Sequence, residues 1–256
     1  MTALLEVRDV SLAFQGVKAI SDLSFSVRRG EVCALIGPNG AGKSSLLNIL
    51  NGVYRADAGE LLFDAKPLRR AHPFHAARLG IGRTFQNNAL FKPLSVLDNL
   101  LTGLSRFQRS LFLEQALGLP RARREARAFS ERAEAVLEFL DLQPWREVAV
   151  GSLAYGLQKR VELGRALIAQ PRLLLLDEPM AGMNAQEKRD MSRFIADLNR
   201  DLGTTVILIE HDIQVVMGLS SHVVVLDYGR KVGDGTPAEV QADPEVIAAY
   251  LGAPHG

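Results

Sequence analysis

Apolar and polar residues alternate along the first part of the chain, from about residue 4 to residue 31. The stretches LLEVRDVSLAF and ISDLSFSVRRG have this period of two, which is typical of strands with one face in water. The run VCALIG that follows is apolar throughout, as expected for a strand buried on both faces. The pattern therefore predicts an antiparallel sheet, a turn at Arg29-Gly30 and then a buried strand.

The next part of the chain mixes helical and strand periods. KSSLLNILNG predicts a helix that ends near Gly52, and GELLFDAKPL predicts a short strand. A further short strand is expected from Ile81 to Gln86, leading into a loop. From Leu94 to about Trp145 the apolar residues recur at helical spacing, which predicts an inserted helical subdomain.

Strand and helix patterns then alternate again to the end of the chain. RLLLLDE and TTVILIE predict buried strands, AQEKRDMSRFIADLNRDLG predicts a helix between them, and a second helix is expected to run through Met217. HVVVLDYGRKVGDG predicts two strands joined by a Tyr-Gly turn. The alternation favours an α/β fold with a mixed, mostly parallel sheet, an N-terminal antiparallel β subdomain and an inserted α-helical subdomain.

Composition narrows the function classes. The 256 residues are 47% hydrophobic and 23% charged, as in ordinary globular proteins, and the formal net charge is only +1, so we expect no nucleic-acid partner. The single cysteine, Cys33, excludes a disulfide within the chain and is expected to be a buried, inert thiol. We see neither a signal peptide nor an apolar run near the roughly 18 residues that span a bilayer, so a cytoplasmic protein, soluble by itself, is expected.

A glycine-rich segment, GPNGAGKS, lies between the buried strand VCALIG and the helix that follows. Its glycines allow backbone N–H groups to surround phosphate oxygens, Lys43 can reach the β- and γ-phosphates, and Ser44 can bind Mg²⁺. The helix N-terminus adds a favourable dipole. The segment predicts a nucleotide-phosphate site formed by Gly37, Pro38, Asn39, Gly40, Ala41, Gly42, Lys43, Ser44 and Ser45.

Two acidic residues end the strand RLLLLDE. Asp177 is expected at the carboxyl edge of the sheet, where open α/β sheets bind their ligands. It would hold the hydration shell of Mg²⁺, and Glu178 would position and polarise an attacking water. A glutamate in this place predicts hydrolysis of the nucleotide rather than binding alone.

The phosphate loop, followed by the turn, helix and strand of SLAYGLQKRVELGRALIAQPRLLLLDEP, resembles the ATP-binding-cassette (ABC) ATPases. Leu153 to Leu157, LAYGL, occupies the place of the family's signature, usually LSGGQ. Importers of branched-chain amino acids resemble LAYGQ here, and Leu157 departs even from that form. The resemblance implies that Leu153, Ala154 and Gly156 bind the γ-phosphate of ATP held by the opposite subunit. Because Ala154 has no hydroxyl, backbone N–H groups would carry this contact.

The same resemblance assigns roles to residues outside these segments. Gln86 matches the glutamine that touches Mg²⁺ and couples the nucleotide to the membrane partner, and His211 matches the switch histidine that contacts the γ-phosphate. Phe14 matches the aromatic residue that stacks on adenine. Asn184 lies where the family usually has an aspartate. The remaining histidines, His72, His75, His222 and His255, form no metal-ligand spacing and are expected in surface or loop positions.

By this resemblance the chain is a single ABC nucleotide-binding domain over residues 1–256, with its core and β subdomain in 1–93 and 160–256 and its helical subdomain in 94–159. The implied function is a transport ATPase that uses ATP and Mg²⁺ at the cytoplasmic face of the inner membrane. Its implied partners are transmembrane permease subunits, a second ATPase subunit and, indirectly, a solute-binding protein.

Two surfaces are candidates for contact outside the chain. A permease helix is expected near residues 85–91 and 94–100, with Leu90 and Phe91 as exposed anchors. The arginine-rich run RARREAR, residues 121–127, is expected to be a solvated helix face; contact with anionic lipid headgroups or with the partner is the alternative.

Two other functions stay open on the sequence. The ATPase of lipopolysaccharide export is a similar cassette, but its signature resembles LSGGE, whereas this chain has LAYGL. A soluble ABC protein acting on ribosomes or DNA would resemble either a tandem cassette or a cassette with a long coiled-coil insertion, and neither pattern is present. Import is therefore favoured over both.

Overall fold

The computed structural model describes residues 2–68, 72–84 and 90–251, with side chains through residue 248. Its contacts divide the chain into two compact units. The first consists of Met1–Arg83, Arg172–Ala181 and Ile195–Gly256, and the second of Thr84–Pro171 and Gly182–Phe194. The second unit is thus wider than the helical subdomain expected over 94–159.

An antiparallel sheet forms one layer of the first unit. Its strand order is β2-β1-β4-β5, with β1 (Ala3–Phe14), β2 (Val17–Arg28), β4 (Ala58–Phe63) and β5 (Lys66–Pro67). The predicted N-terminal antiparallel sheet is confirmed. The single strand expected in GELLFDAKPL is instead the hairpin β4–β5, which turns at Asp64 and Ala65, both with positive φ. Aspartate tolerates this left-handed backbone well, but the sequence offers no glycine there to indicate the turn.

The second sheet of this unit has the strand order β10-β9-β3-β8-β7-β6. Every adjacent pair is parallel except β9 with β10, which confirms the predicted mixed, mostly parallel sheet. All residues of β3, β7 and β8 are buried, as their continuous apolar sequences predict. The strands are β3 (Val32–Ile36), β6 (Ile81–Arg83), β7 (Leu173–Asp177), β8 (Thr205–Ile209), β9 (His222–Asp227) and β10 (Arg230–Gly235).

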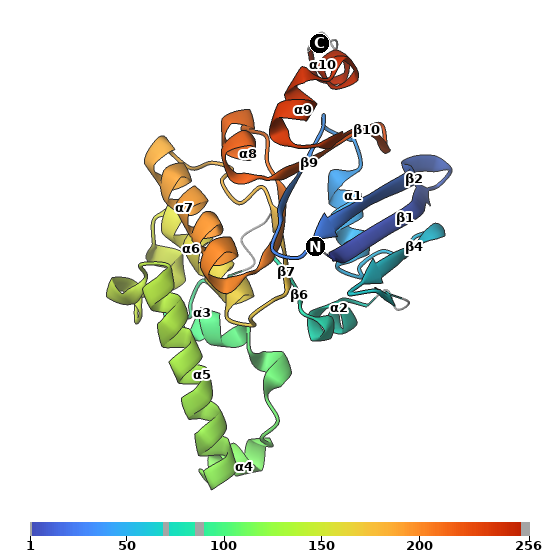
Figure 1. The fold of residues 1–256 in the computed structure, drawn as a ribbon. Coiled ribbons are helices and arrows are strands. Elements are labelled where there is room, and N and C mark those ends of the chain that lie inside the picture. The colour runs from blue at the N-terminus through green and yellow to red at the C-terminus, as the bar shows by residue number, and fades with distance from the viewer. Residues whose placement is uncertain (1, 69–71, 85–89, 252–256) are drawn as a thin grey trace. The chain divides into compact units, whose positions relative to one another are not determined.

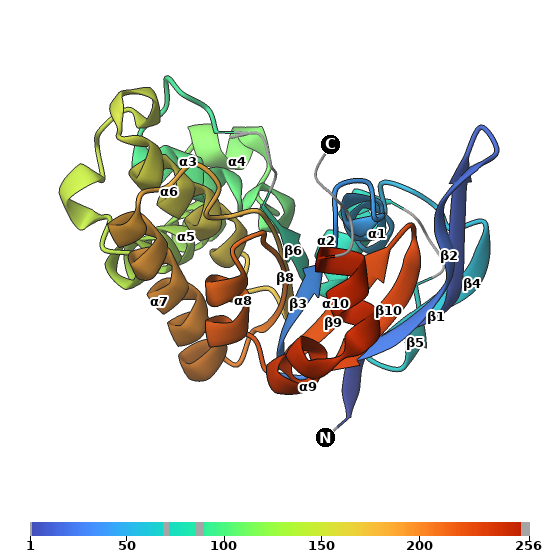
Figure 2. The ribbon, with the colours of Figure 1, turned by 90° about the horizontal axis from the view of Figure 1, so that it is seen from above.

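Strand β3 contributes to a hydrophobic core on each face of this sheet. Cys33 and Leu35 pack with α1 and the antiparallel sheet, and Ala34 and Ile36 pack with α8, α9 and α10 (Figure 2). Burial raises the pKa of the Cys33 thiol, so this cysteine is the inert core residue expected. The helices of this unit are α1 (Lys43–Leu50), α2 (Pro73–Leu79), α8 (Ile213–Leu219), α9 (Pro237–Ala242) and α10 (Pro244–Leu251).

The second unit is helical. It contains α3 (Val96–Thr102), α4 (Phe112–Ala116), α5 (Pro120–Phe139) and α6 (Tyr155–Leu167), with short 3₁₀ turns at Ser105–Phe107, Gln143–Trp145 and Val150–Ser152 (Figure 1). Gly164 lets α6 approach its neighbours, because a Cβ there would lie 2.7 Å from Leu100 and 2.9 Å from Leu140. Helix α7 (Ala185–Leu202) begins in this unit and ends in the first. Among the residues that the structure describes, every helix is too short or too polar to cross a bilayer.

His222 is more buried than the sequence suggests. Its side chain, at the start of β9, is 13% exposed; Nε2 lies 2.7 Å from Asp234 Oδ1 and Nδ1 lies 3.5 Å from Glu31 Oε2. Hydrogen bonding to Asp234 is the largest cause that raises its pKa, to about 12. The expectation of a surface or loop histidine was therefore wrong for His222, which is a largely buried strand residue whose ring lies between Asp234 of β10 and Glu31 before β3. His255 lies outside the described residues.

The charge of His222 predicts a pH-dependent stability. Because the folded pKa lies far above the unfolded value of about 6.5, the stabilisation is complete below that pH and is lost as pH rises toward 12. His222→Gln should therefore lower the free energy of unfolding most near pH 6. Above pH 6, the difference in this free energy between variant and wild type should narrow by at most about 1.4 kcal/mol per pH unit. Urea unfolding from pH 6 to pH 9 measures it, with His75→Gln as the matched control; a gap independent of pH would contradict a charged His222.

Candidate functional site

The predicted phosphate loop and the two acidic residues meet at one edge of the parallel sheet. Because β3, β7 and β8 are parallel neighbours, their carboxyl ends lie together. The loop 37–42 follows β3, Asp177 ends β7 with Glu178 after it, and Glu210 and His211 follow β8. The structure thus brings together Lys43, Asp177, Glu178 and His211, although 168 positions separate Lys43 from His211 in the sequence.

The phosphate loop is held against both sheets of the first unit. A Cβ on Gly37 would lie 2.1 Å from the Leu226 carbonyl oxygen, and one on Gly42 would lie 2.5 Å from the Ala19 carbonyl oxygen. Both glycines also have positive φ, of 151° and 98°. Larger residues are therefore excluded at these two positions by both space and backbone conformation.

Lys43 lies inside the loop that precedes it. Its ammonium donates hydrogen bonds to the carbonyl oxygens of Gly37, at 2.7 Å, and Pro38, at 2.9 Å. The residue is 7% exposed, and burial lowers its pKa, opposed by the charges of Glu178 and Asp177. A buried ammonium whose printed hydrogen bonds go to neutral carbonyl oxygens is well suited to bind an anion that enters the loop.

The start of α1 is open for an anion. Gly42 is the N-cap and supplies no side-chain hydrogen bond, and the first turn has no acidic residue. Ser44 in this turn is exposed, as are Asn39 and Gly40 in the loop, whereas Ala41 is buried. Unsatisfied backbone N–H groups and a positive helix end favour a bound phosphate here.

Asp177 is paired with a residue that the sequence analysis missed. The Asp177 carboxylate is 2% exposed, and its Oδ2 accepts a hydrogen bond from Arg83 NH2 at 3.1 Å. Arg83 also donates to Asn48 Oδ1 at 2.6 Å. Burial raises the pKa of Asp177, and the charge and hydrogen bond of Arg83 oppose that rise. The signal for Arg83 would have been its place at the end of β6, the strand next to β7.

The other oxygen of this carboxylate, Asp177 Oδ1, is buried and has no hydrogen-bond partner among the residues that the structure describes. Such an orphaned acceptor is costly unless a ligand satisfies it. A hydrated divalent cation would do so, because hard cations bind through carboxylate oxygens and retained waters. The residues present therefore fit a magnesium ion, with Ser44 and Asp177 as the described candidates to hold it.

Glu178 and His211 face one another across the ends of β7 and β8. Glu178 Oε1 lies 2.9 Å from His211 Nε2, and the Glu178 backbone donates to the Ile209 carbonyl oxygen at 3.0 Å. Glu178 has a φ of 50°, unusual for a residue with a side chain. The carboxylate is 22% and the imidazole 47% exposed, so both are accessible to a ligand.

Glu210 ties the loops after β7 and β8 together, and the sequence analysis missed it as well. This residue is 5% exposed, and its carboxylate accepts hydrogen bonds from the backbone N–H of Met180, at 2.8 Å, and of His211, at 3.3 Å. Burial raises its pKa. Its signal was present in the sequence, because Glu210 directly follows an apolar strand, much as Asp177 ends one.

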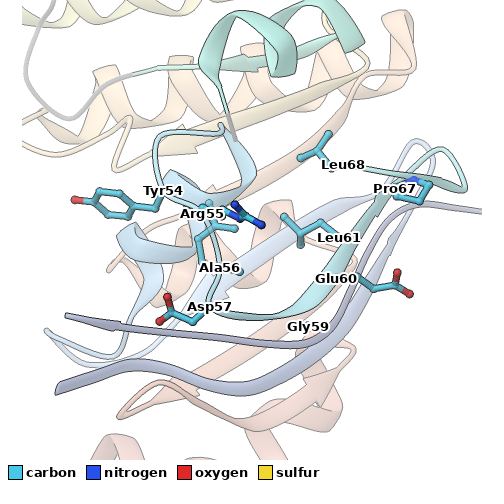
Figure 3. A pocket seen from close by; sticks show the side chains of 10 residues that line it. Tyr54, Arg55, Ala56, Asp57, Gly59, Glu60, Leu61, Pro67 and Leu68 are labelled. Carbon is cyan, nitrogen blue, oxygen red and sulfur yellow. The ribbon is translucent and has the colours of Figure 1, made fainter. Parts of the chain in front are cut away.

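Phe14, the predicted adenine-stacking residue, is 42% exposed and packs edge-on against Tyr54, with 5.1 Å between ring centroids. Beside it lies a cavity of about 460 Å³ between the loop that carries Tyr54 to Asp57 and the strands β4 and β5 (Figure 3). The cavity combines Arg55 with the acidic Asp57 and Glu60, so it favours no single ligand charge. None of the predicted phosphate-binding residues lines it.

The predicted permease contacts are described only in part, since Gln86 lies outside the described residues. Leu90 is 9% exposed, so the expectation that it is an exposed anchor was wrong; Phe91 is 53% exposed. The buried Asn99 fixes this segment, because its side chain accepts from the Phe91 N–H and donates to the carbonyl oxygens of Phe91, Leu94 and Ser95. Phe91 is thus exposed on a loop whose backbone is held in place by Asn99, which we call the braced loop.

The predicted signature lies at the start of α6 in the second unit. Leu153 is buried, and Ala154 is the N-cap and provides no side-chain hydrogen bond. Gly156 is buried, and a Cβ there would lie 2.4 Å from Glu187 Oε1. Glu187 in turn accepts from the Asn184 N–H at 2.9 Å, while the Asn184 side chain caps the start of α7. The helix start therefore offers backbone N–H groups with no side-chain cap.

Comparisons with known proteins agree with this geometry. A family model described as "ABC transporter" matches residues 20–181, and one described as "Branched-chain amino acid ATP-binding cassette transporter" matches residues 230–256. The chain is 39% identical to the high-affinity branched-chain amino acid transport ATP-binding protein BraF of Pseudomonas aeruginosa, over 97% of this chain and 98% of that protein. It is 36% identical to LivG of Escherichia coli, which carries the same description, over the same shares.

A solved structure described as the ADP conformation of an ATP-binding cassette of an ABC transporter superposes on this chain with a TM-score of 0.85. Its sequence is 31% identical, and the match covers 99% of this chain and all of that one. The α/β fold derived from the sequence is therefore confirmed over nearly the whole chain.

The role of Glu210 can be tested through stability. Glu210→Ala leaves two backbone N–H groups without their acceptors and should lower the free energy of unfolding by about 2–4 kcal/mol. Glu210→Gln keeps the volume and one acceptor and removes a buried charge, so its loss should be about 1 kcal/mol. Urea unfolding at pH 7 compares them. If the glutamine variant proved as unstable as the alanine variant, the charge and not the number of acceptors would hold the loops.

Proposed function

The chain belongs to the ABC transporter family of ATP-binding proteins, and from this premise we propose that it powers the uptake of branched-chain or related hydrophobic amino acids. It is an ATPase of the importer type, as its relatives are. The proposed class of solute rests on two matches. The chain is 39% identical to a branched-chain amino acid transport ATP-binding protein over 97% of its length, and residues 230–256 match the branched-chain family model.

Binding of the nucleotide phosphates is assigned to the loop 37–45. Lys43, which in this structure donates to the Gly37 and Pro38 carbonyl oxygens, exchanges these neutral acceptors for the β- and γ-phosphate oxygens. The open N–H groups at the start of α1 add further donors. Phe14, exposed on its outer face and supported by Tyr54, is the proposed stacking surface for adenine.

Magnesium is proposed to accompany the nucleotide, held by Ser44, Gln86 and, through water, Asp177. The orphaned Oδ1 of Asp177 supports this assignment. When bound, the cation would offset the negative charge of the phosphates. Arg83 holds the carboxylate in place from the opposite side by binding Oδ2.

Glu178 is the proposed base that orients and polarises the attacking water. Its carboxylate lies within hydrogen-bond distance of His211, which fixes its direction; His211 is proposed to contact the γ-phosphate as well. Glu210 supports both residues, because it holds the backbone of the loops that carry them. Catalysis would then consist mainly of positioning and charge stabilisation by Lys43 and His211.

A second ATPase subunit is needed in this proposal. One chain has one phosphate loop and one signature, so Leu153, Ala154 and Gly156 would face ATP held by the opposite subunit. The uncapped N–H groups at the start of α6 support a phosphate contact without the missing serine hydroxyl. This geometry does not require a different protein as the second subunit, because a copy of this chain would supply the same groups.

Membrane permease subunits are the proposed partners of the braced loop that displays Phe91. The protein would be peripheral, bound at the cytoplasmic face of the inner membrane through these subunits. A solute-binding protein outside the membrane would interact with the permease and not with this chain. Purification of the tagged protein from native membranes, followed by mass spectrometry, tests the proposal.

Two multi-span permeases and a second ATPase among the co-purified proteins would support import. A lipid-export assembly that bridges the periplasm would move the cargo to lipopolysaccharide. Ribosomes or DNA-bound proteins without any membrane subunit would rule out transport.

Glu178→Gln tests the proposed base. The substitution keeps the size and the contact with His211 but removes the carboxylate that polarises water, so ATP turnover should fall roughly a hundredfold or more while ATP binding remains. The variant should also accumulate as an ATP-bound dimer, which size-exclusion chromatography with ATP detects. Normal turnover in this variant would remove Glu178 from its proposed role.

The signature is tested by comparing two neighbouring residues. Tyr155→Ala should have a small effect on ATP-driven dimerisation, since its ring is 43% exposed and the proposed contact is through the backbone. Gly156→Asp places a second carboxylate against Glu187 and should lower ATPase activity roughly a hundredfold. Equal losses would contradict the backbone argument.

A Glu187→Ala background separates the two causes of the Gly156→Asp defect. Recovery of activity there would assign the defect to the clash with Glu187. Persistent loss would assign it to the phosphate-facing side of the helix start.

A further inference from the structure

The tip of the helical unit exposes a cluster of large apolar side chains that no part of the proposed nucleotide chemistry uses. Leu111, Phe112, Leu113 and Leu117, in and beside α4, are 69%, 82%, 70% and 72% exposed. We call these four residues the apolar tip. Figure 1 shows α4 at the end of the unit, beside the start of α5. Contiguous exposed apolar side chains of this size mark an interaction surface.

The backbone of this tip is held in place. Glu125 of α5 accepts hydrogen bonds from the backbone N–H groups of Arg109, at 2.7 Å, and Ser110, at 2.9 Å. Glu114 accepts from the Leu111 N–H at 2.6 Å, and the Gln115 side chain donates to Ser110 Oγ at 2.9 Å. These hydrogen bonds hold the backbone of the segment while its apolar side chains remain exposed.

The cavity nearest to the tip does not take up these side chains. A cavity of about 520 Å³ lies beside α4 and α5, lined by residues such as Leu101, Ala122 and Phe129. None of the four residues of the apolar tip lines it. Their exposure is therefore outward, toward a surface outside this unit.

Positive charge surrounds the tip. Residues 105–132 contain seven arginines and three glutamates, a net charge of +4 in a chain whose total is +1. Arg121, Arg123, Arg124 and Arg127 are all exposed along the first turns of α5. Arg121 lies 3.7 Å from Glu114 of α4, and Arg123 lies beside Gly118, so these cations adjoin the tip.

We infer that the apolar tip and these four arginines form a docking surface for the anionic lipid bilayer. Leu111, Phe112, Leu113 and Leu117 enter the boundary between headgroups and acyl chains, and the arginines bind lipid phosphates. This inference rests on the proposed function, because a transport ATPase works beside a membrane.

The shape and charge of the surface favour lipid over a protein groove. Three consecutive side chains, Leu111 to Leu113, are exposed together, so they point in several directions from a five-residue helix. A helix that binds in a groove presents apolar residues at spacings of three and four along one face. A fluid bilayer accepts apolar groups in any direction, and its phosphates match the four exposed arginines at the start of α5.

Vesicle flotation with the purified full-length chain tests the inference, without any permease present. The wild type should bind vesicles of phosphatidylcholine mixed with phosphatidylglycerol and should bind pure phosphatidylcholine weakly. Phe112→Ser/Leu113→Ser should weaken binding at least about tenfold on anionic vesicles. Arg123→Gln/Arg124→Gln should weaken binding roughly tenfold or more on anionic vesicles only. High salt should reduce the difference between wild-type binding to anionic vesicles and to pure phosphatidylcholine.

Matched controls lie in the first unit. Leu202→Ser/Ile247→Ser removes exposed apolar side chains, and Arg8→Gln/Arg29→Gln removes exposed arginines; both should bind like wild type. Thermal unfolding checks that each variant folds. ATP hydrolysis, measured in the same preparations without vesicles, separates this inference from the proposed function.

Absence of wild-type binding to anionic vesicles, with ATP hydrolysis intact, would overturn the lipid inference alone. The same holds if Phe112→Ser/Leu113→Ser binds vesicles like wild type. Loss of co-purifying permease in that variant, with no vesicle binding by wild type, would identify the tip as a protein contact. If the wild-type protein binds anionic vesicles but does not hydrolyse ATP, the lipid inference stands and the missing hydrolysis counts against the proposed function.

Discussion

The burial of the Asp177 carboxylate is the constraint on which the site depends. A carboxylate that is 2% exposed is costly unless cations and donors compensate it. Arg83 supplies one cation and donates to Oδ2, while Asn48 of α1 orients that arginine. Oδ1 accepts no hydrogen bond within the described part of the chain, and burial raises the pKa of the group. The protein thus keeps one oxygen of a buried acid in need of a partner, which is how a site for a hydrated cation is prepared in advance.

The backbone conformation directly after Asp177 also places a functional side chain. Glu178 must leave the strand at once to place its carboxylate near His211, and it does so with a φ of 50°. Such a conformation persists only where its surroundings hold it. The Ile209 carbonyl accepts from the Glu178 N–H, and Glu210 binds the backbone of both Met180 and His211. The strained Glu178 is therefore held by the end of β8, while the buried Glu210 carboxylate holds His211 and the loop that follows Glu178.

The sequence predicted those features that local composition encodes. The buried strands were visible as continuous apolar runs, and the phosphate loop as glycines around Lys43 between a strand and a helix. Helices α2, α9 and α10 were not predicted, although Thr236 and Glu239 form a capping box at the start of α9. Arg83 and His222 were missed because each acts through a partner on a neighbouring strand, and which strands adjoin is a property of sheet topology that residue patterns do not reveal. Glu210 was visible at the end of an apolar run, but its partners, the backbone N–H groups of Met180 and His211, are set by the fold.

Gly156 shows how one residue can satisfy two requirements. The family pattern assigns this glycine to the approach of a phosphate, and the structure gives it a second reason to be small, since a Cβ would lie 2.4 Å from Glu187 Oε1. Glu187 is itself fixed by the Asn184 N–H, so the glycine, the glutamate and the α7 cap pack as a set. A glycine at this position is therefore not sufficient evidence for a phosphate contact. Ala154 points more directly to a phosphate contact, because an N-cap without a hydroxyl leaves backbone N–H groups as the donors at the start of α6.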